Sequence, residues 1–439
     1  MTEKNYKEIF KNYAQPMIIR SVFNSFMHTA DRMIAALFIG ANALVATTIA
    51  SPLMYLTYAI SALFIGGLGA YVGLLIGQEK VKEANRLSSG ILLVLLALGL
   101  MMTLPIVSFS NQISSFLGAS DKVFDMTVSY LSIFSLSFPF MLIGRTLDVL
   151  IYNDDSPRYS FIVNVITTSM NLGLNIIAIV VFDLGIIGLA GATVISSAFQ
   201  CIASLYYFVF KSKTIKLTKP SIKLKKIIRI CYNGLSDFSM LIVDAVMVFV
   251  VNQAFTRFLT PAHFEAYAAV NVLLIVFYGI FMGATMGLQP IFSRSMGQKK
   301  YKYLKGLLAY SVKRTIILGL IAYLAFIPIA SRVLSLFVQD QGTLELAIFF
   351  YLTLGFAVMF SNLPLQTSIF FTAINRPVES ALISILRTLI FIPLIAYFSI
   401  MYIGAIGVAF GFLVADLILI SGLVVYMKRV DISKLKILE

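Results

Sequence analysis

The sequence predicts an all-α membrane fold with twelve transmembrane helices in two six-helix bundles. Of the 439 residues, 59% are hydrophobic and only 12% are charged, whereas a soluble domain is about 25% charged. A helix needs about 20 mainly apolar residues to cross the roughly 30 Å hydrocarbon core, and runs of that length recur along the whole chain. Transmembrane β-strands would alternate apolar and polar residues in segments of about ten. The run ILLVLLALGLMM (91–102) shows no such alternation.

We expect six spans in each half of the chain. The first six lie near residues 16–39, 48–76, 90–110, 127–151, 160–182 and 186–209. The second six lie near residues 231–256, 267–292, 309–330, 345–372, 379–400 and 404–427. The charged segment MTEKNYKEIFKNYAQP (1–16) lacks the short apolar core and small-residue cleavage site of a signal peptide. The first span is therefore expected to remain in the mature protein.

The positive charge of the chain is distributed as in a multi-pass membrane protein. With a cytoplasmic N-terminus, 27 of the 34 Lys and Arg residues fall in the tails, in the even-numbered loops or, for Lys313 and Arg314, at the cytoplasmic end of the ninth span. The opposite loops hold only Lys122, Arg257 and Arg332. By the positive-inside rule, both termini are expected in the cytoplasm, with the chain in the cytoplasmic membrane of a bacterium. The densest basic cluster (211–229) is expected to lie near anionic lipid rather than to bind nucleic acid.

The composition offers no site for enzymatic chemistry. Cys201 and Cys231 stand alone, without metal-ligand spacing, and we expect them to be packing residues rather than a disulfide. There is no zinc-binding spacing, no phosphate-binding glycine loop and no Ser/His/Asp arrangement. We therefore expect no enzyme activity, no metal and no cofactor beyond a coupling H⁺ or Na⁺.

The two halves repeat one another at a shift of about 220 residues. GQEK (77–80) aligns with GQKK (297–300), and Pro157 and Ser160 align with Pro377 and Ser380. GIIGLA (185–190) and GAIGVA (404–409) align at a shift of 219. Because each half has six spans, the repeat is parallel, with its pseudo-twofold axis along the membrane normal. We expect an N-terminal lobe (1–210), a basic connector (211–229) and a C-terminal lobe (230–439).

Several segments together resemble the multidrug and toxic compound extrusion (MATE) family of cation-coupled exporters. The similar segments are TADRMIAALFIGANALVA (29–46), IYNDDSPRYS (151–160), NLGLNIIAIVVFDLGIIGLAGATVIS (171–196), GLSDFSMLIVDAVMVFVVN (234–252), GLQPIFSRSMGQKKY (287–301) and FFTAINRPVESALISILR (370–387). They are spread along the chain, and the resemblance extends over nearly its whole length. The resemblance implies alternating access between two lobes, coupled to an ion gradient.

Five acidic residues at membrane depth are candidates for function, because a charge there costs at least about 2.5–3.5 kcal/mol. They are Asp31, Asp148, Asp237, Asp244 and Asp416. The alternative for each is a paired carboxylate that joins two helices, or one close enough to a helix end to reach water.

The first span carries the leading candidate for cation coupling. Asn24, His28 and Asp31 are spaced i, i+4 and i+7, which places them on one face of a helix. Asp31 matches the Asp of the first span in the family. His28 is either a structural residue or a group that tunes or relays a proton to Asp31.

The fourth and fifth spans carry further coupling candidates. Asn171 and Asn175 lie on one face of the fifth span; the resemblance implies an Asn and often an Asp there, so Asn175 departs from the family pattern. Tyr130 and Asp148 fall where the family places a Tyr and an Asn, so the carboxylate could have moved to the fourth span. Arg145, three residues before Asp148, leaves open an intrahelical ion pair.

In the second half, Asp237, Asp244 and Asn252 are candidates for coupling or for contact with a cationic substrate. Asp237 and Asp244 are seven residues apart on the seventh span, and Asp237 could instead reach the cytoplasmic surface. Asp244 lies ten residues after Gly234, where some family members carry a Glu. Further candidates for the substrate cavity are polar residues within spans: Asn24, Gln289, Asn362, Gln366 and Asp416.

We therefore expect a monomeric antiporter that exports an amphipathic or cationic small molecule in exchange for H⁺ or Na⁺. One alternative on the same architecture is a flippase for a lipid-linked anion, whose cavity would be lined with Arg or Lys. The intramembrane Arg residues, Arg20, Arg32, Arg145 and Arg387, are few and scattered. The other alternative, a membrane transferase, would require paired carboxylates and a metal, and the single cluster NDDSPR (153–158) is better interpreted as a turn.

Overall fold

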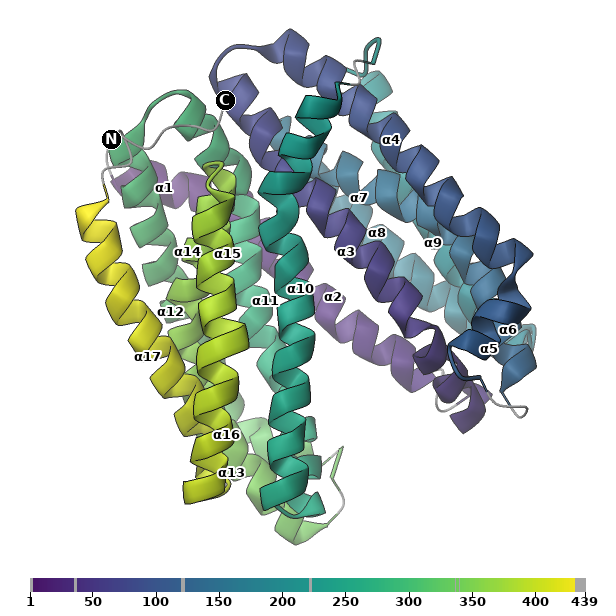
Figure 1. Cartoon of the computed structure of the whole chain (residues 1–439), viewed down its shortest axis with the longest axis vertical. Coiled ribbons are helices and arrows are strands. Elements are labelled where there is room, and N and C mark those ends of the chain that lie inside the picture. The colour runs from purple at the N-terminus through teal and green to yellow at the C-terminus, as the bar shows by residue number, and fades with distance from the viewer. Residues whose placement is uncertain are drawn as a thin grey trace. The chain divides into compact units, whose positions relative to one another are not determined.

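The computed structural model is built of long helices (Figure 1). It describes residues 3–34, 38–119, 123–220, 223–335, 337–338 and 340–430, and those ranges contain no β-strand. Ten helical segments are long and apolar enough to cross a membrane, within the part of the chain that is described. They correspond to ten of the twelve expected spans. The other two expected spans are helices α2 (Gln15–Ile34) and α10 (Leu224–Phe258), parts of which lie outside the described side chains.

The first half of the chain consists of α-helices with a few short segments of 3₁₀ or π geometry. The elements are α1 (Glu3–Ile9), η1 (Phe10–Ala14), α2, α3 (Ala41–Gly77), α4 (Val81–Ser108), α5 (Ser110–Phe116), α6 (Phe124–Phe134), η3 (Ser135–Ser137), α7 (Phe138–Asn153), α8 (Pro157–Ile176), η4 (Ile177–Val181) and α9 (Gly185–Phe210). Helices α6 and α7, joined by the 3₁₀ turn η3, form one span, as do α8 and the π-helix η4.

The second half follows the same plan. Its elements are α10, α11 (Pro261–Gly297), α12 (Tyr301–Leu334), α13 (Gln341–Val358), η5 (Met359–Ser361), α14 (Asn362–Ala373), α15 (Pro377–Ser384), η6 (Ile385–Phe391), α16 (Ile392–Ile403) and α17 (Ile406–Arg429). The 3₁₀ turn η5 joins α13 and α14 into one span, and the π-helix η6 joins α15 and α16 into the next.

Backbone turns recur at the predicted repeat distance. Glu79 and Lys299, each two residues after a helix that ends in Gly, have φ angles of 63° and 59°. Asp155 and Asn375 follow the next matching pair of helix ends, with φ angles of 56° and 63°. Side chains other than Gly rarely adopt this left-handed conformation. Its recurrence 220 residues apart therefore shows that the two halves use the same turns.

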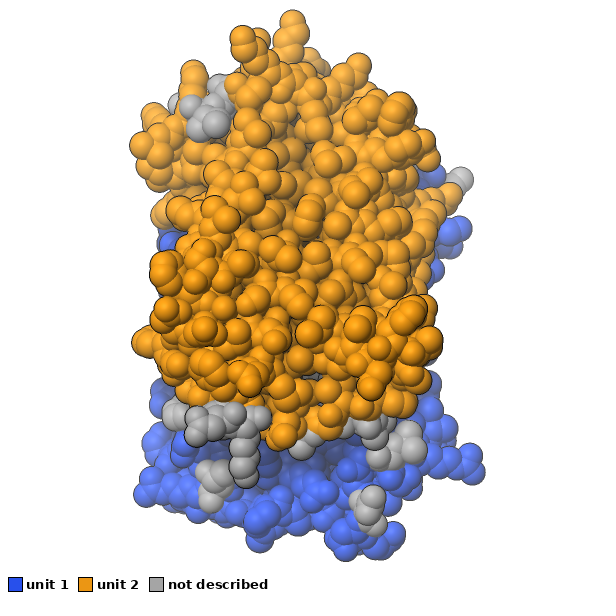
Figure 2. Space-filling model, turned by 90° about the vertical axis from the view of Figure 1, so that its right-hand side faces the viewer, with its two compact units in different colours: residues 1–22, 235–439 blue, residues 23–234 orange. Residues whose placement is uncertain are grey.

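The chain divides into two compact units (Figure 2). The unit of residues Phe23–Gly234 is called here the N-terminal unit, and the unit of residues Met1–Val22 and Leu235–Glu439 the C-terminal unit. Helices α2 and α10 each contribute residues to both units. The first turns of α10 pack closely on α3, because Gly67 and Gly234 have no side chain: a methyl group on either would overlap the backbone of Ile230 or Leu63. The lobe boundaries at 210 and 230 stay a prediction.

The start of the connector is bound to the N-terminal unit by one carboxylate. Asp154, which is 1% exposed, accepts hydrogen bonds from the backbone N–H groups of Lys213, Thr214 and Ile215 at 2.6–2.7 Å. It also accepts a hydrogen bond of 2.6 Å from the hydroxyl of Tyr207. The segment NDDSPR is a turn, as predicted, but its first Asp also fixes the connector in place.

Candidate functional site

A stripe of polar side chains runs along helix α8 in the N-terminal unit. Its members are Ser160, Asn164, Thr167, Thr168, Asn171 and Asn175. At about 100° per residue, these positions fall within an arc of about 100° around the helix. The large exposed side chains of α8, Ile162, Ile166 and Ile176, lie on the other side. The helix is therefore amphipathic within the membrane, and its polar face turns toward the interior of the unit.

At one end of this stripe lies the carboxylate of Asp148, from helix α7. The hydroxyl of Ser160 donates a hydrogen bond to Asp148 Oδ1, and both side chains are buried. The guanidinium of Arg145 lies over the ring of Tyr58, 4.4 Å from its centroid. Among the described residues, Arg145 and Asp148 form no ion pair with each other. The carboxylate considered for an intrahelical pair thus takes part in a hydrogen bond between α7 and α8.

In the middle of the stripe, two hydrogen bonds connect α8 to neighbouring helices. Thr168 Oγ1 donates to Asn24 Oδ1 of α2 at 3.2 Å, and Asn171 Nδ2 donates to Ser196 Oγ of α9 at 3.2 Å. Asn175 is also buried, one turn further along. The predicted residues Asn24, Asn171 and Asn175 are therefore brought to one region, and Ser196 and Thr168 join them.

Two of the predicted coupling residues lie outside the described side chains. His28 and Asp31 belong to helix α2, but the positions of their side chains are not described. Their spacing from Asn24 places all three on one face of α2. Their role in coupling stays a prediction.

Tyr130 lies at the opposite end of its span from Asp148. The two residues are 18 positions apart along α6, η3 and α7, which corresponds to about 27 Å. Tyr130 stacks on Phe134 with ring centroids 5.3 Å apart, in an apolar cluster that also includes Ile179 and Leu189. The structure therefore does not bring Tyr130 and Asp148 together.

The C-terminal unit contains a buried ion pair. Arg387 of η6 and Asp416 of α17 are 5% and 0% exposed, and Arg387 Nε lies 2.7 Å from Asp416 Oδ1. The hydroxyl of Ser361, in η5, donates to Asp416 Oδ2 at 2.6 Å and accepts a bond from Arg387 Nη2 at 2.7 Å. The sequence analysis named both charged residues but did not predict that they pair. Their opposite charges within the same half could have indicated the pair.

Asn362 and Gln366 belong to a second closed network in the same unit. Gln366 Oε1 accepts a bond from Ser311 at 2.6 Å, and Thr315 Oγ1 donates to Asn362 Oδ1 at 3.0 Å. Gln366 Nε2 donates to Thr315 at 2.6 Å. These side chains are fully buried between α12 and α14. They hold the two helices together by hydrogen bonds within the unit.

The remaining C-half candidates are spread over two helices. Asp237 and Asn252 are half-buried on α10, and Gln289 is buried on α11. The side chain of Asp244 lies outside the described residues. None of the hydrogen bonds described joins Asp237, Asn252 and Gln289 to one another.

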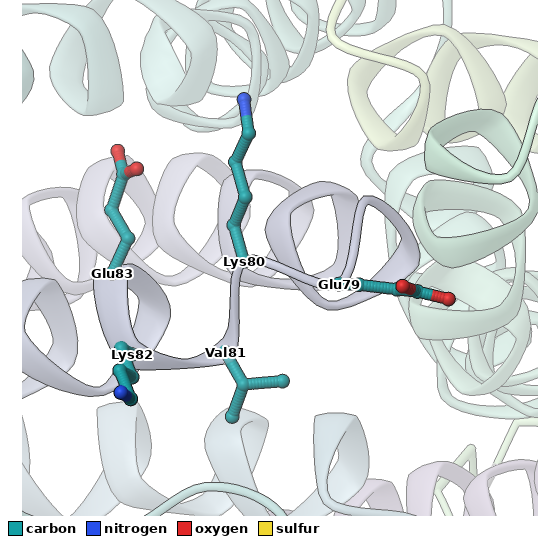
Figure 3. A pocket seen from close by; sticks show the side chains of 5 residues that line it. All are labelled: Glu79, Lys80, Val81, Lys82 and Glu83. Atoms are coloured by element: carbon teal, nitrogen blue, oxygen red, sulfur yellow. The ribbon is translucent and has the colours of Figure 1, made fainter.

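A pocket of about 490 Å³ lies at the turn between α3 and α4 (Figure 3). It is lined by Glu79, Lys80, Val81, Lys82 and Glu83, and the side chains of Lys80 and Glu83 point to the same side of the turn. Glu83 pairs with Lys226 at the start of α10 at 2.5 Å. Four of its five lining residues are charged, three of the five belong to the first turn of α4, and no predicted coupling residue lines it.

The chain matches the MatE family model over residues 16–177 and 235–415, which is well over half of its length. The chain belongs to the MatE family. This confirms the resemblance drawn from the sequence motifs. MatE proteins are membrane transporters, and this chain is a multi-pass membrane protein of that family.

Similar proteins include two multidrug export proteins. Multidrug export protein MepA of Staphylococcus aureus (strain bovine RF122 / ET3-1) is 24% identical over 440 residues, covering 97% of this chain and 95% of the relative. MepA of Staphylococcus saprophyticus is 21% identical over 437 residues, covering 98% of this chain and 96% of the relative. The MatE chain thus aligns with these proteins from end to end.

Two solved structures of membrane transporters share the fold. An outward-facing multidrug resistance MATE family transporter of the MOP superfamily gives a TM-score of 0.90 at 18% identity, covering 97% of this chain and 96% of that chain. A MOP superfamily transporter from Pyrococcus furiosus gives 0.84 at 17% identity, covering 96% of each. At these identities the likeness concerns the fold, and it confirms the predicted twelve-helix architecture.

Proposed function

We propose that this protein is a secondary active exporter of amphipathic or cationic organic molecules, driven by antiport of H⁺ or Na⁺. The observation that carries this proposal is the polar region of the N-terminal unit. There α8 bonds to α2 through Thr168 and Asn24, to α9 through Asn171 and Ser196, and to the carboxylate of Asp148 through Ser160. Membership of a transporter family and end-to-end alignment with multidrug export proteins support the substrate class.

The coupling cation would act on the packing of the helices that meet at this region. Asp31, on the same face of α2 as Asn24 and about two turns further along, is the proposed binding carboxylate, with His28 one turn before it. A cation that binds there neutralises a charge at membrane depth, where an uncompensated charge is costly. Neutralisation changes the preferred packing of α2 against α8, and this local change biases the alternation between inward-facing and outward-facing states. Substrate release follows because the cation-loaded state binds substrate less tightly.

We further propose that the protein lies in a bacterial cytoplasmic membrane with both termini in the cytoplasm, and that it works as a monomer. The excess of Lys and Arg in the tails and even-numbered loops supports this orientation. In this orientation, the turn between α7 and α8 and the connector lie on the cytoplasmic side.

The alternative function, flipping of a lipid-linked anion, receives less support. A site for an anion requires accessible cationic side chains. Arg387 is buried against Asp416, so its charge is already compensated. Arg145 is half-buried and lies over Tyr58.

Purified protein in proteoliposomes tests the proposal. An organic cation such as ethidium is loaded, and a pH jump or a Na⁺ jump is applied separately. We expect one of the two gradients to drive substrate movement against its concentration, and Asp31→Asn to abolish this coupling. Movement that is unaffected by either gradient would exclude antiport. Loss of a labelled lipid-linked anion from one leaflet, without movement of organic cations, would favour the flippase.

A further inference from the structure

Two members of the α8 stripe have buried oxygen atoms that no described protein group satisfies. Asn164 is 7% exposed and Thr167 is 9% exposed. Neither Asn164 Oδ1 nor Thr167 Oγ1 has a hydrogen-bond partner among the described residues. Buried polar atoms in native proteins are nearly always bonded, and those without a protein partner are typically bonded to ordered water. These two oxygens therefore mark a polar, water-accepting place inside the N-terminal unit.

These oxygens lie between the two parts of the stripe that are hydrogen-bonded to other helices. Ser160, with its bond to Asp148, lies one turn before Asn164, and Thr168, with its bond to Asn24, lies one turn after it. From Ser160 to Asn175 the stripe extends over 15 residues, about 22 Å along the helix. The hydrocarbon core is about 30 Å thick. The stripe is therefore long enough to reach across most of the membrane, with a carboxylate at the end that the proposed orientation places toward the cytoplasm.

The equivalent positions of the other half are saturated or apolar. Shifted by 220, Ser160 and Asn164 become Ser380 and Ser384, and the hydroxyl of Ser368 bonds to both at 3.0 and 2.9 Å. Thr167 becomes Arg387, which is paired with Asp416. Asn171 and Asn175 become Phe391 and Ile395. In the second half, the repeat-equivalent helix thus forms a packing contact without water.

We propose that the polar face of α8 is a hydrated route by which the coupling cation passes between the cytoplasm and the polar region at Asn24, Thr168 and Asn171. This rests on the proposed antiport function. The carboxylate of Asp148 lies at the cytoplasmic end of the route, and the oxygens of Asn164 and Thr167 hold the water molecules between that end and the coupling region. Water bound to such oxygens can solvate Na⁺ or pass on a proton, so the route serves either cation.

Cysteine accessibility tests the route without requiring transport. In a variant with Cys201 and Cys231 replaced by Ala, Asn164→Cys is compared with its repeat equivalent Ser384→Cys, and Thr167→Cys provides a second position. The reagent is 2-aminoethyl methanethiosulfonate, a small cation, applied to full-length protein in liposomes. We expect Asn164→Cys and Thr167→Cys to react and Ser384→Cys to stay unmodified. Equal protection of all three thiols in folded protein would overturn the route.

Transport kinetics provide the second test. The shape-conserving double variant Asn164→Leu/Thr167→Val removes the buried oxygens, and Thr388→Val, at the repeat equivalent of Thr168, is a control on the corresponding helix of the other half. We expect the charge displacement that follows a cation jump to slow at least about tenfold in the double variant, equivalent to about 1.4 kcal/mol of barrier. Substrate affinity and the control should be unchanged. If wild type shows no cation-driven signal, the proposed function fails; if wild type and the double variant respond equally fast, only the route fails.

Discussion

The two halves of this protein share their backbone plan but differ in the way their buried polar groups are satisfied. In the C-terminal unit, two buried polar sets are closed: Arg387, Asp416 and Ser361 bond to one another, and Asn362 and Gln366 bond to Ser311 and Thr315. The hydroxyls of Tyr303 and Thr367 in that unit have no partner among the described residues. In the N-terminal unit, the α8 stripe bonds to three other helices and still has oxygens without a partner among the described residues. The two copies of a duplicated fold can therefore satisfy the buried polar groups of their equivalent helices in different ways.

The largest effect is expected from breaking the ion pair of the C-terminal unit. Asp416→Ala leaves the guanidinium of Arg387 buried without a counter-charge, and removal of one partner from a buried pair typically costs about 3–5 kcal/mol. We expect a markedly lower unfolding temperature. The measurement is size-exclusion chromatography after heating, because the chain has no Trp for fluorescence.

The double variant Arg387→Met/Asp416→Leu is the control for that prediction. It removes both charges and retains apolar volume, so stability should return close to that of wild type. Cation-driven transport by the double variant should also persist. If transport is lost while stability is retained, the C-terminal pair takes part in coupling and the contrast between the halves is wrong.

The opposite pattern is expected for Asp31→Asn in the N-terminal unit. This substitution removes the proposed cation-binding charge with almost no change in shape, so we expect cation-driven export to be abolished while the unfolding temperature changes little. The measurement is uptake into inside-out vesicles under an imposed gradient, with substrate binding in detergent as the control. Export that continues under the same gradient would remove Asp31 from the coupling site.

An intermediate effect is expected for Asp148→Asn. The amide oxygen can still accept the hydrogen bond from Ser160, so the contact between α7 and α8 remains. The negative charge at the entrance of the α8 route is lost, and we expect the initial transport rate to fall several-fold, with a stability change below about 1 kcal/mol. Ser368→Ala, at the equivalent position of the other half, should leave the rate unchanged. Equal rates for Asp148→Asn and wild type would show that this charge does not assist cation entry.

The smallest effect on transport is expected from Asp154→Ala, which frees the connector. This substitution leaves three backbone N–H groups of the connector without their partner. We expect faster tryptic cleavage near Lys213 and Lys216 but nearly normal export. Asp155→Asn, at the neighbouring position, should leave cleavage unchanged. Position 374 of the other half, the equivalent of Asp154, is Ile, so this attachment belongs to the first half only.

The parts of the structure that the sequence predicted are those determined by local pattern. Apolar length placed the spans, and the shift of 220 placed the turns at Glu79 and Lys299. The pairing of Arg387 with Asp416 could not be predicted in the same way, because the residues lie 29 positions apart on different helices. The role of Asp154 could not be predicted for a related reason. A turn sequence does not indicate whether its carboxylate accepts hydrogen bonds from a distant segment of backbone.

Within the candidate site, the helical spacing of Asn171 and Asn175 correctly placed both side chains on the polar face of α8. Tyr130 and Asp148 were grouped by a different argument, namely that both match family motif positions, although 18 residues of helix separate them. Spacing along one helix predicts which face a residue occupies. It does not predict which neighbouring helix that face meets, since that depends on packing across the whole unit.

The π-helices have a consequence for attempts to exchange function between the halves. In the first half, η4 begins after Ile176, so α8 keeps one regular helical face along the whole stripe. In the second half, η6 occupies residues 385–391, and its wider turn rotates every later side chain relative to the earlier ones. Asparagines grafted at Phe391 and Ile395 would therefore not continue the face that begins at Ser380. The second half would need a residue deleted from η6 before it could acquire a cation route of its own.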